Sequence, residues 1–216
     1  MFEFIKKLLI KGKDVGFFAQ KGLIAMNDKN YSSAVKNYTN AIILEDDNIE
    51  YYYQRAMAYN YLNSYENALK DLNIVHTLQA NLGENISTFS GNEVYVPDHT
   101  RRKSIEIKRL LKDYDGAIED VNILLNNDPD NIDNMDLKAD IYKSKQDYES
   151  ALSLINKILE KEPNNGHFYL FRCGLNKELN NLEQAKKDLQ KALSLGLPSD
   201  DKEGAQKYTE EFNKQI

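Results

Sequence analysis

The side chains that most often do chemistry are few and scattered in this sequence. Its three histidines are His76, His99 and His167, and its one cysteine is Cys173. No two of the histidines are spaced as metal ligands on one helix face are, and Cys173 has no neighbouring residue with metal-ligand spacing. A single thiol also forms no internal disulfide. We therefore expect no catalytic, metal-binding or cofactor-binding residues, and no cofactor.

Other common sequence signatures of catalysis are also absent. The sequence contains no glycine-rich phosphate loop, no nucleophile elbow and no dinucleotide fingerprint. The acidic stretch 128–133 lacks the alternating ligands and the terminal glutamate of a calcium loop, and it fits helix capping better. The sequence therefore predicts a protein that is not an enzyme.

Composition narrows the class of protein further. The 216 residues are 41% hydrophobic and 29% charged, with 4 prolines and 10 glycines, which argues against a disordered chain and against an all-β protein. The formal net charge of −6 disfavours nucleic acid as a partner. No apolar run is long enough to cross a membrane, and the apolar stretch in residues 1–10 is interrupted by charges. We expect a cytoplasmic protein.

An internal repeat organises most of the chain. A bulky residue, aromatic in four copies and leucine in the fifth, precedes an alanine by three positions at Ala34, Ala68, Ala117, Ala151 and Ala185. The spacings between these alanines are 34, 49, 34 and 34 residues, so an insertion of 15 residues separates the first two copies from the last three.

Each copy has the pattern of two helices. After each alanine, apolar residues recur at i, i+4 and i+7, which is one face of an α-helix. Twelve residues before the alanine lies a small residue in four copies: Gly22, Ala56, Ala139 and Cys173. A small residue lets two helices approach closely, so we expect Cys173 to be a buried, unreactive thiol. Pro129 and Pro163 end two of the second helices.

Together, the period of 34, the small residue, the aromatic-x-x-Ala step and the terminal acid-proline pair resemble tetratricopeptide repeats. The resemblance covers about residues 15–199, apart from the insertion. It implies an all-α fold, a right-handed α-α superhelix (a tetratricopeptide-type solenoid) of five helix-turn-helix repeats plus a C-terminal capping helix. The repeats would span 15–48, 49–82, 98–131, 132–165 and 166–199. The third copy departs most, with Arg101 at the aromatic position and Ile105 at the small position.

Three segments lie outside the repeats. Residues 1–14 are an N-terminal segment or cap, although residues 1–13 are also basic and amphipathic, and we keep membrane contact as a less favoured alternative. Residues 83–97 are an insertion loop, and Pro97 predicts that the next helix begins at or after it. Residues 200–216 predict a capping helix near 201–214, with Asp200 and Glu203 as a capping box.

The resemblance also implies where a partner would bind. First helices line the concave groove in this family, and matching its groove positions selects Leu23, Met26, Tyr53, Met57, Asn60, Tyr61, Arg102, Glu106, Arg109, Asp136, Asp140 and Leu170. The predicted function is therefore a protein-interaction module, or adaptor, that binds a peptide or helix of a partner protein. The alternative is a structural subunit or homo-oligomeric scaffold of a larger assembly.

Some relatives grip the C-terminal carboxylates of chaperones with a clamp of lysine, asparagine and arginine side chains. Residues 51–59 resemble the second repeat of these relatives, but the clamp positions hold Ala19, Leu23 and Gln54 instead. Because such a clamp depends on charge-assisted hydrogen bonds, we expect that chaperone C-terminal peptides do not bind.

Overall fold

A computed structural model of the chain describes residues 14–82 and 97–214. All regular elements within these ranges are α-helices. The N-terminal cap or membrane segment predicted for residues 1–13, and nearly all of the predicted insertion loop, lie outside the described residues. Pro97 is described, and it is the first residue of a helix, as the sequence predicted.

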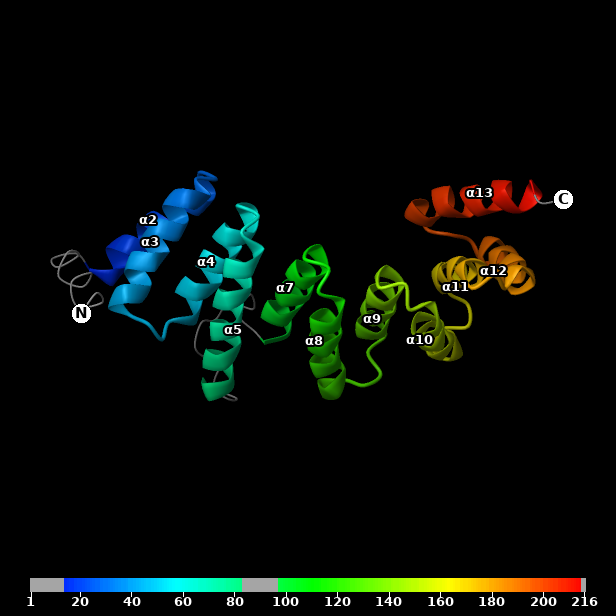
Figure 1. Cartoon of the computed structure of the whole chain (residues 1–216), viewed down its shortest axis with the longest axis horizontal. Helices are drawn as coiled ribbons and strands as arrows, with labels where there is room; N and C mark the ends of the chain where they lie inside the picture. Colours follow the sequence, from blue (N-terminus) through cyan, green and yellow to red (C-terminus); the bar gives the residue numbers. More distant parts are fainter. Residues whose placement is uncertain (1–13, 83–96, 215–216) are drawn as a thin grey trace. The chain divides into compact units, whose positions relative to one another are not determined.

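The chain divides into two compact units, and the boundary falls between Asp120 and Val121, inside one helix. Unit 1 therefore contains the first three predicted repeats up to Asp120. Its helices, labelled in Figure 1, are α2 (Val15–Asn27), α3 (Tyr31–Leu44), α4 (Ile49–Tyr61), α5 (Tyr65–Leu82), α7 (Pro97–Leu110) and the first half of α8 (Tyr114–Asn127). Within it, α2 packs against α3, α4 against α5, and each pair against the helix that follows.

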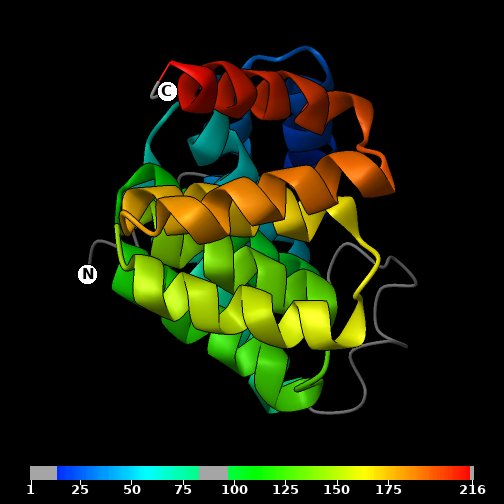
Figure 2. The same cartoon turned by 90° about the vertical axis from the view of Figure 1, so that its right-hand side faces the viewer.

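Unit 2 contains the predicted fourth and fifth repeats and one additional helix. Its helices are the remainder of α8, α9 (Ile132–Ser144), α10 (Tyr148–Lys161), α11 (Gly166–Glu178), α12 (Leu182–Leu195) and α13 (Ser199–Asn213). The pairs α9–α10 and α11–α12 form helical hairpins, and α13 contacts both helices of the last pair. Figure 2 shows α13, in red, alongside α12.

The repeated alanines form the centre of each hairpin. All five, from Ala34 to Ala185, are fully buried, because each side chain lies where a second helix meets its first helix. The apolar residues four and seven positions later are buried as well, which confirms the helix face inferred from the sequence.

The turn between the two helices has the same backbone conformation in all five repeats. A residue in the left-handed region lies two positions before each second helix: Lys29, Asn63, Lys112, Gln146 and Asn180, with φ between 56° and 66°. None of them is glycine, although glycine adopts this conformation at least cost. The next residue caps the second helix in several repeats; for example, Asn30 and Asp147 accept hydrogen bonds from Ser33 N and Ser150 N.

The capping helix starts earlier than predicted. It begins at Ser199, its N-cap is Pro198, and no side chain caps it, so the expected capping box of Asp200 and Glu203 does not form. Asp200 instead lies in the first turn, where the positive end of the helix dipole stabilises its carboxylate.

Candidate partner-binding surface

The predicted groove residues of unit 1 lie next to the buried face of each first helix. In α2, Gly22 and Ala25 are buried. Of the residues that follow them, Leu23 is exposed and Met26 is half-buried. In α4, Ala56 is buried and Met57 is half-buried. The hairpin core therefore fixes the rotation of each first helix, and that rotation turns the predicted positions toward the surface.

Two apolar side chains at these positions are largely open to solvent. Leu23 is 49% exposed and Tyr61 is 59% exposed. The ring of Tyr61 stacks on Tyr31 of α3, with centroids 4.5 Å apart and planes 13° from parallel, so it is held in one orientation. Met26 and Met57 pack on the core of unit 1 while remaining partly exposed.

Tyr53 differs from its neighbours because it is buried. Its hydroxyl lies 3.1 Å from Nε2 of His99 on α7, within hydrogen-bond distance. Burial raises the pKa of Tyr53 to about 12, with smaller contributions from Tyr61 and Glu106, so the hydroxyl stays protonated at neutral pH. His99 was not predicted as a groove residue, although it lies about one helical turn before Arg102, which was.

The other predicted residues of unit 1 are polar. Arg102 and Glu106 are exposed on α7, whereas Asn60 and Arg109 are half-buried. Glu106 forms an ion pair with Lys103, with Nζ and Oε2 3.0 Å apart, and an exposed pair of this kind contributes little stability.

In unit 2, Asp136 and Asp140 are half-buried on α9. Oδ1 of Asp136 is buried without a hydrogen-bond partner among the described residues. Burial raises the pKa of Asp136, and the nearby His167 opposes that shift. These carboxylates make this surface unlike the apolar one in unit 1.

Leu170 is buried beneath α13, in a cluster with Ala205 and Phe212. Two polar contacts flank this cluster. Nδ1 of His167 lies 2.8 Å from Oδ2 of Asp201, within hydrogen-bond distance, and Lys177 forms an ion pair with Glu211, with Nζ 2.5 Å from Oε2. The capping helix thus covers the face of α11 on which the sequence placed Leu170, so this side chain is not available to a partner while α13 is in place.

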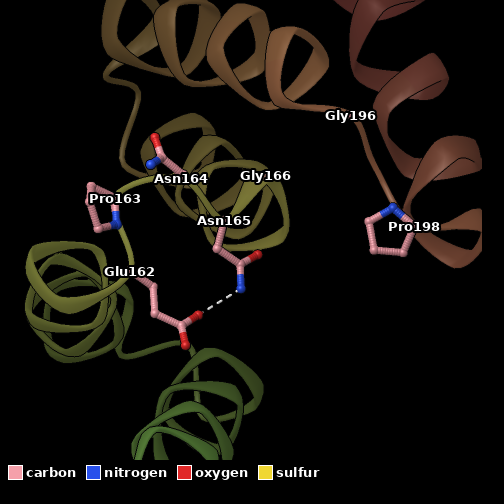
Figure 3. A pocket seen from close by; sticks show the side chains of 7 residues that line it. All are labelled: Glu162, Pro163, Asn164, Asn165, Gly166, Gly196 and Pro198. Atoms are coloured by element: carbon pink, nitrogen blue, oxygen red, sulfur yellow. Dashed lines mark hydrogen bonds between the residues drawn. The ribbon is translucent and has the colours of Figure 1, made fainter.

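A separate hollow of about 530 Å³ lies where the α10–α11 and α12–α13 links meet (Figure 3). Its lining is Glu162, Pro163, Asn164, Asn165, Gly166, Gly196 and Pro198. The carboxylate of Glu162 accepts a hydrogen bond of 2.8 Å from Nδ2 of Asn165. None of the predicted groove residues lines this hollow. Its one charged side chain, Glu162, is already engaged in the hydrogen bond within the turn.

The described residues contain no group of three or more histidines, cysteines and acids that could hold a metal ion. Cys173 is buried in the core of the last hairpin, and burial raises the pKa of its thiol to about 12. In the part of the chain that the structure describes, none of the helices is long and apolar enough to cross a membrane.

The pairing of helices with a 34-residue period has a counterpart among known families. Residues 133–165 and 175–195 match the family model described as tetratricopeptide repeat. These two stretches carry tetratricopeptide repeats. No curated protein matches it.

Solved structures share the tetratricopeptide-type solenoid fold. YrrB, described as a TPR protein with an unusual peptide-binding site, is 14% identical, with a TM-score of 0.64 over 96% of this chain and 97% of YrrB. MamA 41-end from Desulfovibrio magneticus RS-1 is 14% identical, with a TM-score of 0.62 over 85% of this chain and 96% of MamA. Another MamA crystal structure has 13% identity, a TM-score of 0.63 and coverages of 84% and 91%. At these identities the likeness establishes the fold.

Proposed function

We propose that unit 1 is a protein-interaction module that binds a peptide or helix of a partner protein through the first helices α2 and α4. The observation that carries the proposal is that apolar side chains at the groove positions of these two helices remain partly exposed. We call Leu23, Met26, Met57 and Tyr61 the groove surface.

The chemistry of the groove surface suits a protein ligand. Methionine side chains adapt their shape to different apolar partners, and tyrosine is enriched at protein interfaces. Covering an exposed Leu23 alone would contribute about 1 kcal/mol, so several such contacts are required for useful affinity. An amphipathic helix or an extended peptide with apolar anchors provides such contacts.

The ligand is not the C-terminal carboxylate of a chaperone. Ala19 and Leu23 supply no hydrogen-bond donor at two of the clamp positions, and Gln54 replaces asparagine at a third. We expect isothermal titration with a chaperone C-terminal peptide to give no heat of binding. Micromolar affinity would contradict this part of the proposal.

The test compares two variants of the full chain in a pull-down from native cells. Met57→Glu introduces a charge into the groove surface, and Ile74→Ser removes an exposed apolar side chain from the outer face of α5. We expect Met57→Glu to lose the bound partner and Ile74→Ser to keep it. If Met57→Glu retains the full set of partners, the groove surface is not the binding site.

The same variants test the second candidate, a subunit of a larger assembly held through its outer faces. Ile74 on α5 and Ile123 on α8 occupy the same register in their repeats, and both are more than one third exposed. Size-exclusion chromatography with light scattering separates the two functions. A stable homo-oligomer that dissociates in Ile74→Ser supports the assembly, whereas a monomer favours the groove.

A further inference from the structure

Helix α2 exposes an apolar position that is buried in other repeats. Ile24, the tenth residue of its repeat, is 52% exposed, whereas the matching Ala58 in α4 and Leu175 in α11 are 0% exposed. Both α4 and α11 pack against the second helix of the preceding repeat, α3 and α10 respectively. The described chain begins at Asp14, so no described helix takes this place beside α2.

Two hydrogen bonds give the register of that packing. Nη1 of Arg55 donates to Oγ1 of Thr39 at 3.0 Å, and Nη1 of Arg172 donates to Oδ1 of Asn156 at 2.8 Å. In each pair, the second-helix residue precedes the first-helix residue by 16 positions. A segment that packs on α2 in the same way should therefore place residue n against residue n+16.

The residues before α2 fit this register. Lys21 matches Arg55 and Arg172 in the 34-residue period, and the residue 16 positions before it is Ile5. Phe4 and Leu8 precede Tyr38 and Ile42 by one period, and both of the latter are buried core residues of α3. Lys7 departs from the pattern, because it falls on the position of Ala41.

The N-terminus of α2 also resembles that of first helices that follow another repeat. Oδ1 of Asp14 accepts a hydrogen bond of 2.9 Å from Gly16 N. The residues at the same position in later repeats do the same. Asn48 accepts a hydrogen bond of 3.0 Å from Glu50 N, and Asn165 accepts one of 3.1 Å from His167 N. Each of these two asparagines is the last residue of a four-residue link from the preceding helix. Residues 11–14 would form a link of the same length.

We propose that residues 1–10 occupy the exposed face of α2 in cis, as the second helix of a half repeat whose Ile5 lies against Lys21 and whose apolar side chains cover Ile24. A hollow of about 440 Å³, lined by Lys21, Ile24 and Lys36 among others, lies on α2 and α3 at this end of unit 1. The half repeat closes the apolar end of the array, which terminal repeats of solenoids must do.

Two other occupants compete with this one. A second copy of the chain could cover the face, or residues 1–13 could bind an anionic membrane through their apolar stripe and their lysines. Each of these alternatives predicts a different result in the experiment below.

The experiment is thiol cross-linking of the full chain with a short bis-maleimide. Ile5→Cys is combined with Lys21→Cys, and the matched control combines Glu3→Cys with Lys21→Cys. Residue 3 lies roughly 200° from residue 5 around a helix, so it would face away from α2. Cys173 is replaced by alanine in both chains, although its burial already protects it.

We expect the Ile5 pair to form an intramolecular cross-link about tenfold faster than the control pair, because docking raises the effective concentration of the two thiols. Equal rates for the two pairs would overturn the proposal. Cross-linked dimers would assign the face to a second copy, and co-sedimentation of the unmodified full chain with anionic vesicles at low salt would assign the segment to a membrane.

Hydrogen exchange provides a readout that does not depend on the cysteines. Deletion of residues 1–10 should speed exchange in α2 at least severalfold and leave α11 and α12 unchanged. Unchanged exchange in α2 contradicts the proposal even if the cysteine variants fail to react.

Discussion

Arg55 of α4 and Asp71 of α5 form a bidentate ion pair: Nη2 lies 2.7 Å from Oδ1, and Nε lies 2.8 Å from Oδ2. The same pair recurs in unit 2 between Arg172 and Asp188, at 2.7 and 3.0 Å. In both cases the guanidinium also donates to the preceding second helix, so one side chain ties together three helices of neighbouring repeats.

We predict that Asp71→Ala lowers the free energy of unfolding of unit 1 by about 3 kcal/mol, because it leaves a largely buried arginine without its carboxylate. Urea denaturation of the variant gives the value. The double variant Arg55→Met/Asp71→Leu removes both charges, and it should recover most of the loss. An equal loss in the single and double variants would show that packing, not the uncompensated charge, is responsible.

A second prediction concerns the fit between Gly22 and Tyr38. A β-carbon built on Gly22 would lie 2.8 to 2.9 Å from three ring atoms of Tyr38, which is closer than real contacts allow. Alanine adds about 1 kcal/mol of helix propensity, but overpacking of a rigid ring costs about 1–3 kcal/mol. Gly22→Ala should therefore destabilise the protein in thermal unfolding.

The effect of Gly22→Ala on stability should change sign when the ring of Tyr38 is removed. Leu72 and Leu189 occupy the position of Tyr38 in other repeats, opposite Ala56 and Cys173. In a Tyr38→Leu background, we expect Gly22→Ala to stabilise the protein relative to that background. Destabilisation in both backgrounds would mean that Tyr38 is not the obstacle.

The third prediction is a pH dependence that arises from His76. Burial lowers the pKa of His76 from 6.5 to about 4, and the nearby positive charge of Arg101 contributes in the same direction. The negative charge of Asp120 opposes this shift. The unfolded chain therefore binds more protons than the folded chain between these values, and the free energy of unfolding falls as the pH decreases from about 6.5 to about 4.

His76→Leu should remove this part of the pH dependence, because Leu159 and Leu193 take the same register in other repeats. Urea denaturation at pH 7 and pH 4.5 measures it for both chains. If the two chains lose equal stability between these values, His76 is not the group that titrates.

The fourth prediction concerns the left-handed turn residues. Gln146 has φ of 66°, which costs a non-glycine residue about 1–2 kcal/mol, partly offset by the lower unfolded-state entropy of glutamine than of glycine. Gln146→Gly should raise the free energy of unfolding by about 0.5 kcal/mol. Asn180→Gly is the control and should change it less, because asparagine tolerates this conformation. A loss of stability in Gln146→Gly would argue against strain at this turn.

The hairpins themselves could be predicted because their causes are local. A small residue, an alanine twelve positions later and apolar residues one and two turns beyond it are sufficient to place two helices in contact, whatever surrounds them. Ala34, Ala151 and Ala185 were therefore correctly identified as core residues from spacing alone.

Contacts between neighbouring repeats could not be predicted in the same way. Tyr53 and Leu170 have the same register as the exposed groove residue Arg102, yet His99 contacts the first and α13 covers the second. The third repeat has Ser104 where Arg55 and Arg172 stand, and the structure shows Arg101 and Lys108, one turn to either side, binding Asp120 at 2.8 and 2.6 Å.

The period, the helix pairs and the residues buried inside each pair could be predicted, because they follow from side-chain size and spacing within about 34 positions. The folded chain was needed to show which groove positions remain exposed, which acid each arginine contacts and where the capping helix lies. Those outcomes depend on the distance and rotation between repeats, and small differences in packing at each junction set both.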